Sequence, residues 1–410
     1  MTYVDRAARA PAYEAVPPAG AAAGPDGEGP RYDLPVKGQG TIGVVLDQVE
    51  PFTLVASREE GLPAFRWTID RAGARLELLD EAGGETELLF IENVGLDASA
   101  ACPYWFSFDC HNRLVRYGKG EMRKGTMLAS CELPPRPEGE GVMDPFFWIP
   151  DLAWVAISAA PARGIDRWRD PVTVEPPMRI VPHDSITMED IAWGRVTVPA
   201  SLSPTCQKLY DNVAGARFVL DTPDFPEFSA AIEASIVDKD GWCYKTLERK
   251  AAEFGKPDLN KTYLRITLGT NQGESPGVPF VMEIWPSGHY SPVHNHGGAD
   301  AVIRVLHGEI TVQLYRFLAP EEIVPFATKT FVTEDVTWIS ARLNQVHKLV
   351  NLNKDEPCIT IQCYLYAEEN RAHWPYFDYV EGSGIGHFDP NSDAEFLEFK
   401  QLMQAEWARR

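Results

Sequence analysis

The sequence lacks any apolar run near the roughly 20 residues that a membrane-spanning helix needs. Basic residues are also scarce, because 38 Lys and Arg stand against 59 Asp and Glu, which gives a formal net charge of -21. So acidic a chain repels nucleic acid and anionic membranes, since both carry negative charge. We therefore expect neither as a partner, and we expect a protein that handles small molecules.

Cysteine is present, but without a pattern that would make it structural. The seven cysteines are an odd number, and they show neither metal-ligand spacing nor the dense pairing of a small secreted domain. The start of the chain also lacks the basic stretch and apolar core of an export signal. We therefore expect reduced, mostly buried thiols and a cytoplasmic location.

Alternating apolar and polar residues dominate the first part of the chain after a tail rich in Ala, Pro and Gly. Residues 65–69 and 75–79 show this period of two, and residues 104–108 and 113–117 flank a turn, as in a β-hairpin. The pattern predicts a separate all-β, sandwich-like domain. Its role is open, either as a packing module or as a surface that joins subunits into a homo-oligomer.

Helical spacing follows a proline-rich connection. Ser203 is a good N-cap before Pro204, and further helices are predicted at about 227–236 and 241–254. Near the end of the chain, Ser392 is predicted to cap a C-terminal helix. The fold class is therefore mainly β with a small helical layer. The predicted division is a flexible tail at 1–37, an all-β domain at 38–180, a linker and helical layer at 181–260, a second β domain at 261–370, and a C-terminal extension with a helix at 371–410.

Histidine is scarce but concentrated. Only nine histidines occur, and three of them lie within Gly288-His-Tyr-Ser-Pro-Val-His-Asn-His296. On a strand, His294 and His296 would point to the same face. His347 comes later in the chain, where an adjacent strand could bring it alongside. Three imidazoles so arranged can bind one metal ion and leave coordination positions open for small molecules.

This spacing resembles the first metal motif of the cupin barrels, which reads Gly, five residues, His-x-His, three or four residues, Glu, six residues, Gly. Gly288, His294, His296 and Gly308 fit that motif, whereas Ala301 takes the Glu position. Since alanine cannot bind a metal, the usual ligand set is reduced by one.

The second cupin motif ends in His, three residues, Asn, and His347 and Asn351 fit it. The resemblance implies a double-stranded β-helix, or jelly-roll barrel, over 261–370. It also implies three metal ligands: His294, His296 and His347.

Three-histidine cupins with Gly-His-x-Ser-x-x-His-x-His are typical of thiol dioxygenases. The chain resembles cysteine dioxygenase from about Thr262 to Tyr366, and more weakly back to about Phe228. The matching residues outside the histidine motifs are Tyr263-Leu-Arg265, Trp285, Glu356-Pro357 and Tyr364.

The resemblance implies roles for several of these residues. Arg265 would bind the substrate carboxylate, and Tyr364 would reach the metal-bound thiolate and oxygen. Tyr366 is the alternative tyrosine, because it faces the same side of a strand. Tyr263 and Gln362 would line the substrate side of the site. The implied metal is Fe(II), although imidazole ligands alone suit zinc, copper, iron and nickel alike.

Two departures from the family matter for the chemistry. Ala301 stands where the animal enzymes have a cysteine cross-linked to the tyrosine, so no thioether is expected. Gln362 replaces the family histidine two residues before the tyrosine, which leaves the identity of the thiol open.

We therefore expect a non-haem Fe(II)-dependent thiol dioxygenase, which oxidises a small carboxylated thiol, cysteine or a close analogue, to its sulfinate with O2. Two alternatives stay open. One is a metal-dependent cupin that acts on a small organic acid without a thiol, as a C–C cleaving dioxygenase or an isomerase. The other is a non-catalytic, ligand-binding cupin.

Overall fold

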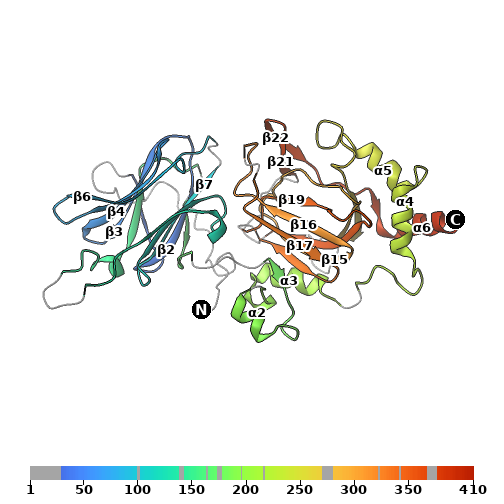
Figure 1. Cartoon of the computed structure of the whole chain (residues 1–410), viewed down its shortest axis with the longest axis horizontal. Helices are drawn as coiled ribbons and strands as arrows, with labels where there is room; N and C mark the ends of the chain where they lie inside the picture. The colour runs from blue at the N-terminus through green and yellow to red at the C-terminus, as the bar shows by residue number, and fades with distance from the viewer. Residues whose placement is uncertain are drawn as a thin grey trace. The chain divides into compact units, whose positions relative to one another are not determined.

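The computed structural model describes residues 29–98, 102–137, 143–162, 165–172, 178–194, 196–215, 218–269, 280–321, 324–340, 343–366 and 376–410. The chain separates into two compact units, Met1–Glu175 and Pro176–Arg410 (Figure 1). Most of the predicted tail, residues 1–28, lies outside the described residues.

The first unit consists of two antiparallel sheets. In order across the first sheet, the strands are β1 (Arg31–Asp33), β10 (Trp154–Ile157), β3 (Phe52–Arg58), β4 (Gly61–Ile69), β5 (Gly73–Leu79) and β6 (Glu85–Glu92). The second sheet holds β11 (Asp166–Trp168), β2 (Gln39–Val45), β7 (Pro103–Asp109), β8 (Leu114–Lys119) and β9 (Met127–Glu132). Short 3-10 turns lie at η1 (Lys124–Thr126) and η2 (Ile149–Asp151).

Aromatic side chains fill the space between these two sheets. Trp67 on β4 lies with its ring centroid 6.1 Å from that of Phe106 on β7 and 5.5 Å from that of Tyr117 on β8. All three side chains are fully buried. The unit is therefore an all-β sandwich, as the alternating sequence pattern predicts, and β7 and β8 form the predicted hairpin.

The structure differs from the predicted division at both ends of this unit. Arg31–Asp33 pairs with β10, and the Tyr32 side chain is buried, so the ordered sandwich begins inside the predicted tail. At the other end, β12 (Arg179–Ile180) pairs with β18 of the second unit. Such long-range pairing leaves little local signal in the sequence, which is why the boundaries were misplaced.

The second unit contains a barrel made from two facing sheets. The larger sheet has the order β12, β18 (Val336–Ile339), β15 (Asp300–His307), β20 (Cys358–Leu365), β14 (Phe280–Trp285), β13 (Leu264–Gly269) and β23 (Ala394–Glu395). The smaller sheet contains β17 (Ala327–Val332), β16 (Glu309–Leu314) and β19 (His347–Val350). A hairpin of β21 (Phe377–Glu381) and β22 (Gly384–Phe388) follows the barrel.

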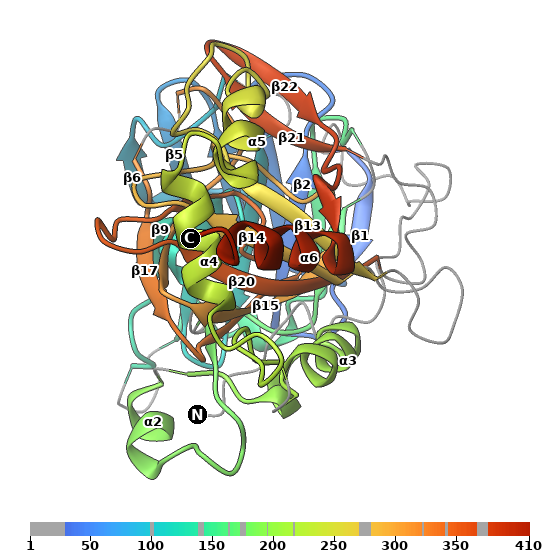
Figure 2. The same ribbon diagram turned by 90° about the vertical axis from the view of Figure 1, so that its right-hand side faces the viewer.

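Helices cover the outer face of the larger sheet, and Figure 2 shows α4 and α6 lying across β13, β14 and β20. The side chains in that contact include Leu264, Ile266, Met282, Ile284 and Ile359. Because neighbours along a strand point to opposite faces, the residues between them point into the barrel. The helices of this unit are α2 (Met188–Trp193), η3 (Pro199–Ser201), α3 (Pro204–Val213), α4 (Phe228–Val237), α5 (Trp242–Lys250) and α6 (Phe396–Trp407).

The predicted start of α3 is confirmed, as are those of α4 and α5, whereas the predicted start of α6 is wrong. The Ser203 hydroxyl accepts a hydrogen bond from the Cys206 amide and caps α3. Ser392 does not cap α6, because its hydroxyl accepts from the Thr267 amide and donates to the Ala394 carbonyl, which ties it to β13 instead. Among the described residues, none of the helices has the length and apolar character needed to cross a bilayer.

Candidate metal centre

The structure brings together the three histidines predicted as metal ligands. Each of His294, His296 and His347 offers a ring nitrogen, and these nitrogens lie within 4.8 Å of one another. His294 and His347 face each other across a β-bridge with paired backbone hydrogen bonds of 2.9 and 3.0 Å. His294 and His296 belong to an extended segment rather than to a named strand, and the turn at Gly297 and Gly298 ends it.

The motif glycines have a clear backbone role. Gly288 and Gly308 adopt φ angles of 75° and 69°, which disfavour residues with a side chain. A Cβ atom on Gly308 would lie 2.4 Å from the Pro357 carbonyl oxygen. Asn351, the end of the second motif, donates from Nδ2 to the Trp285 and Glu356 carbonyls at 2.9 and 3.1 Å. The motifs therefore also fix the turns that hold the histidines.

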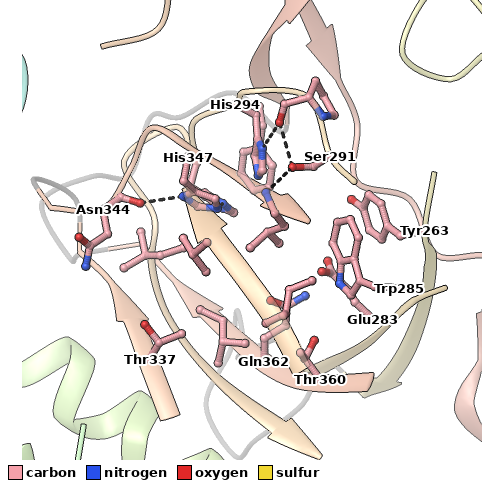
Figure 3. Close-up of a pocket in the computed structure, with 18 of the residues that line it drawn as sticks. Tyr263, Glu283, Trp285, Ser291, His294, Thr337, Asn344, His347, Thr360 and Gln362 are labelled. Carbon is pink, nitrogen blue, oxygen red and sulfur yellow. Dashed lines mark hydrogen bonds between the residues drawn. The ribbon is translucent and has the colours of Figure 1, made fainter. Parts of the chain in front are cut away.

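Backbone carbonyls determine which nitrogen of two histidines is free. Nδ1 of His294 lies 3.0 Å from the Pro292 carbonyl, and Nδ1 of His347 lies 2.8 Å from that of Asn344 (Figure 3). A carbonyl only accepts, so Nδ1 carries the proton in both rings and Nε2 keeps a lone pair. Nε2 of His347 is 3.3 Å from Nε2 of His296. Ring nitrogens that converge in this way can bind one shared cation. Carbonyl groups that accept a hydrogen bond from Nδ1 orient the histidines of metal sites in the same manner.

Burial keeps all three imidazoles neutral. It lowers the pKa of His294 to about 4 and that of His347 to about 3, and the pKa of His296 is well below its usual value. Neutral imidazole is the form that binds metals. The residues therefore fit a divalent ion of the zinc, copper, iron or nickel type.

The other histidines of the sequence lie elsewhere. His289 is buried, and its Nδ1 lies 3.0 Å from the Thr262 carbonyl, outside the metal group. His307 contacts Glu356 at 3.6 Å, and His111 is an exposed residue of the first unit. His373 lies outside the described residues.

A cavity of about 60 Å³ extends from the three histidines into the barrel. Since a single water molecule needs only ~10–15 Å³ of such a cavity, there is room for a small molecule. Its walls come from both sheets and from the hairpin β21–β22. The residues predicted for the site that line it are Tyr263, Arg265, Gln362 and Tyr364, together with the three histidines.

Arg265 does not face this cavity as a free cation. Its Nη1 donates to Oε1 of Glu283 at 2.7 Å, and the two residues are cross-strand neighbours on β13 and β14. Both are almost fully buried, with exposures of 7% and 4%. Burial raises the pKa of Glu283, and the adjacent Arg265 opposes that rise. The sequence did not identify Glu283, although a lone carboxylate in the apolar strand Phe280–Trp285 was the available signal.

Tyr364 is the cavity tyrosine, and Tyr366 is not among the lining residues. Its ring is stacked near that of His296, with centroids 5.8 Å apart, and Arg265 Cζ lies 5.6 Å from its centre. Burial raises the pKa of Tyr364, so its hydroxyl keeps its proton at neutral pH. Ala301 stands opposite Tyr364 in the β15–β20 register, as a fully buried residue without a polar atom.

Two further polar side chains on β20 point into the cavity, and Figure 3 shows both beside Glu283. Thr360 and Gln362 are each 3% exposed. Within the described part of the chain, Thr360 Oγ1 makes no hydrogen bond, whereas the Gln362 amide interacts with Glu283 and opposes the rise in the pKa of that carboxyl. Tyr263 stacks on Trp285 with ring centroids 4.2 Å apart.

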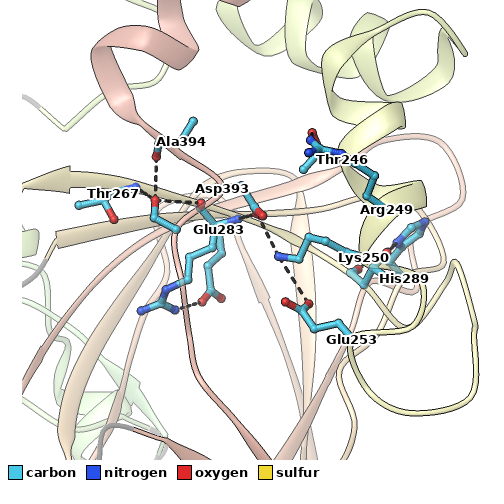
Figure 4. A network of polar contacts seen from close by, with 12 residues as sticks. Thr246, Arg249, Lys250, Glu253, Thr267, Glu283, His289, Asp393 and Ala394 are labelled. Carbon is cyan, nitrogen blue, oxygen red and sulfur yellow. Dashed lines mark hydrogen bonds and ion pairs between the residues drawn. The ribbon is translucent and has the colours of Figure 1, made fainter.

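The C-terminal extension contributes to the site, which the sequence did not reveal. Asp393 Oδ2 accepts from the Arg265 amide at 2.7 Å and from Lys250 Nζ at 3.0 Å (Figure 4). The hairpin strand β21 bonds to the segment that carries His294, and its Phe377 and Tyr379 line the cavity. These contacts join residues far apart in sequence, so no local motif announces them.

The similarity to known proteins lies in the part of the chain that contains the three histidines. The family model for cysteine dioxygenase type I matches residues 228–370. Among solved structures, a cupin domain of an XRE-family transcriptional regulator from Enterobacter cloacae is 14% identical, with 26% of this chain and 98% of that chain covered and a TM-score of 0.21. A cupin superfamily protein from Desulfitobacterium hafniense is 17% identical, with 26% and 79% covered and a TM-score of 0.20.

A third solved structure, oxalate oxidase in complex with the substrate analogue glycolate, is 16% identical, with 31% of this chain and 55% of that chain covered and a TM-score of 0.21. The family match begins after the first unit ends, at the residue where the weaker agreement in sequence was expected to begin. The matched region contains His294, His296 and His347. Residues 228–370 are therefore similar to cysteine dioxygenase type I.

Proposed function

We propose that this protein is a non-haem Fe(II)-dependent thiol dioxygenase that oxidises a small carboxylated thiol, cysteine or a close analogue, to its sulfinate. The observation that carries the proposal is that three neutral imidazoles, two of them buried and that of His294 half-buried, line one small cavity with Arg265 and Tyr364. This cavity lies within the region that the cysteine dioxygenase family model matches. Overall, one thiol and one O2 give one sulfinic acid. Both oxygen atoms enter the product, and no external reductant is consumed.

His294, His296 and His347 would hold the iron, which when bound supplies a Lewis-acidic and redox-active centre for a thiolate and dioxygen. The ligands themselves add no charge, because their low pKa values keep the imidazoles neutral. The centre therefore retains the full positive charge of the ion. That charge favours the thiolate form of the substrate over the thiol.

The remaining cavity residues orient the substrate and exclude water. The Arg265 guanidinium lies beside Tyr364, where it can hold a carboxylate while the thiol end of the same molecule reaches the histidines. The protonated Tyr364 hydroxyl can donate a hydrogen bond to negative charge that develops on oxygen or sulfur. Phe377 and Tyr379 from the hairpin close the histidine side of the cavity with apolar surface.

Oxygen consumption tests the proposal. Protein loaded with one iron per chain is mixed with a panel of thiols and with thiol-free organic acids, and the products are analysed by mass spectrometry after use of ¹⁸O2. We expect uptake with at least one small carboxylated thiol and two labelled oxygens in its sulfinate. His294→Ala should lose iron and uptake together. His307→Ala, a histidine outside the metal group, should keep both.

The result that contradicts the proposal is a protein that retains its iron but consumes no oxygen with any thiol. Uptake with an organic acid alone would favour the alternative in which substrate oxygens approach the metal. Spectroscopy of the nitrosyl complex distinguishes the two, because only a bound thiolate adds a sulfur-to-metal charge-transfer band.

A further inference from the structure

A buried ion pair forms one wall of the cavity. Arg265 and Glu283 are held together by a 2.7 Å hydrogen bond, and both line the cavity that leads to the histidines. A guanidinium cannot release its proton, so this contact favours the carboxylate form of Glu283. The positive charge offered to a substrate by Arg265 is therefore already balanced by a neighbouring negative charge.

This balance changes which substrates the wall favours. A substrate that carries only a carboxylate at its far end would approach Arg265 and meet repulsion from Glu283, in surroundings that screen charges poorly. A substrate with only an ammonium group would meet the converse repulsion from Arg265. A zwitterionic end places its carboxylate against Arg265 and its ammonium against Glu283, so that both contacts are attractive.

Neighbouring polar atoms indicate that a polar ligand completes this wall. Thr360 stands opposite Glu283 in the β14–β20 register, and Gln362 lies two residues further along the same face of β20. Among the described residues, the buried Thr360 Oγ1 has no hydrogen-bond partner, and the buried Gln362 amide interacts with Glu283. Buried polar atoms are nearly always hydrogen-bonded, so the Thr360 hydroxyl beside Glu283 identifies a place where a ligand atom is needed.

We propose that Glu283 is a specificity-determining residue, which binds the ammonium group of a zwitterionic amino-acid thiol while Arg265 binds its carboxylate. The inference rests on the proposed function and deepens it. It places the amine of the substrate against the barrel wall at Glu283. Thr360 and Gln362 lie beside Glu283 and would border the zwitterionic end of the substrate. Tyr364, on the same face of β20 as Gln362, lies next along the strand toward the histidines, where the sulfur would lie.

Anaerobic calorimetry tests the inference without turnover. Iron-loaded protein is titrated with cysteine, with 3-mercaptopropionate, which lacks the amine, and with cysteamine, which lacks the carboxylate. The wild type should bind cysteine at least about tenfold more tightly than either analogue. Glu283→Gln, which removes the charge at nearly constant volume, should weaken cysteine binding and strengthen 3-mercaptopropionate binding, so that the preference for cysteine shrinks about tenfold or more.

Two further variants and two controls distinguish a structural effect from an effect on recognition. Glu283→Asp, which keeps the charge, should retain most of the preference. Glu356→Gln, a carboxylate outside the cavity lining, should leave it unchanged. Thermal unfolding and iron content show whether each variant is folded and loaded, since a merely structural change would weaken all three ligands alike.

The inference is overturned if wild-type protein binds 3-mercaptopropionate as tightly as cysteine, a comparison that needs no variant. It is also overturned if the preference survives Glu283→Gln unchanged, since the amine would then be bound elsewhere. A different result would contradict the proposed function and leave this inference intact. In that case cysteine binding still depends on Glu283, but the addition of oxygen leads to no sulfinate.

Discussion

At the scale of single residues, the barrel contains polar side chains of two kinds. Those with a backbone partner are held in place, as His294 and His347 are by the Pro292 and Asn344 carbonyls. Those without one, such as Thr360 Oγ1, face the cavity. The first kind orients the proposed metal ligands, and the second kind is available to the proposed substrate.

Tyr364→Phe tests a single hydroxyl at the same scale. We expect kcat to fall by roughly 10²-fold, the usual effect of removing one hydrogen-bond donor aimed at developing charge. Iron content and KM should change little, because the ring and its packing against His296 remain. Tyr366→Phe is the matched control, and steady-state kinetics with metal analysis measures both. An equal loss in the two variants would contradict the assignment of Tyr364.

The sequence predicted some residues of the site far better than others. The histidines and Arg265 occur at fixed spacing within short motifs, so local counting was sufficient to find them. Glu283 is different, because its importance comes from a partner on another strand, and strand pairing is not visible along the chain. Asp393 was missed for the same reason, since it reaches Arg265 from the C-terminal extension.

At the scale of elements, the hairpin β21–β22 supports the segment that carries two of the proposed metal ligands. The Asn295 amide donates to the Asp378 carbonyl at 2.9 Å, and the Asp378 amide donates back to Asn295 Oδ1 at 3.1 Å. Asn295 stands between His294 and His296, so this exchange fixes the segment on which both imidazoles depend.

Asn295→Ala removes the side-chain half of that exchange. We expect metal affinity to fall about 10-fold or more, in the range found when groups that orient ligands are removed. Competition with a chelator measures the affinity, and hydrogen exchange of residues 377–388 should become faster. Asn353→Ala, which alters an asparagine outside the site, is the control. Unchanged affinity in Asn295→Ala would mean that the hairpin does not support the ligands.

Helices and strands could be predicted from the sequence where their capping or alternation signals lie within a few neighbouring residues. The helix after Ser203 and the hairpin of β7 and β8 follow from capping and alternation within a few residues. The two-residue strands β12 and β23 were not predictable, because each exists only through its partner, β18 or β13. The misplaced start of α6 has the same cause, since β23 occupies two of the residues where the first helical turn after Ser392 was expected.

At the scale of the whole molecule, the chain has two units, and acid should act on the first one through a defined ion pair. Arg113 and Asp144 form a bidentate contact with two N–O distances of 3.0 Å, and each side chain is 13% exposed. The hydrogen bond from Arg113 lowers the pKa of Asp144. A lowered pKa means that stabilisation is present above the unfolded value of ~3.9 and is lost as pH falls through the folded value.

Asp144→Asn should therefore destabilise the first unit by about 1 kcal/mol at pH 7 and by much less near pH 3. Calorimetric unfolding at a series of pH values measures the difference in melting temperature between wild type and variant. Glu60→Gln, an exposed carboxylate of the same unit, should give a small difference throughout. A difference for Asp144→Asn that grows toward acid would have the wrong sign for this pair.

The order of synthesis gives the C-terminal segments a further importance. All three histidines leave the ribosome before residues 376–395, yet β21 completes the segment around His294 and Asp393 fixes the backbone of Arg265. Until those later residues emerge, the nascent barrel has its ligands without the hairpin that holds them and its arginine without an anchor. We therefore expect full metal affinity only after residues 376–395 have joined the barrel.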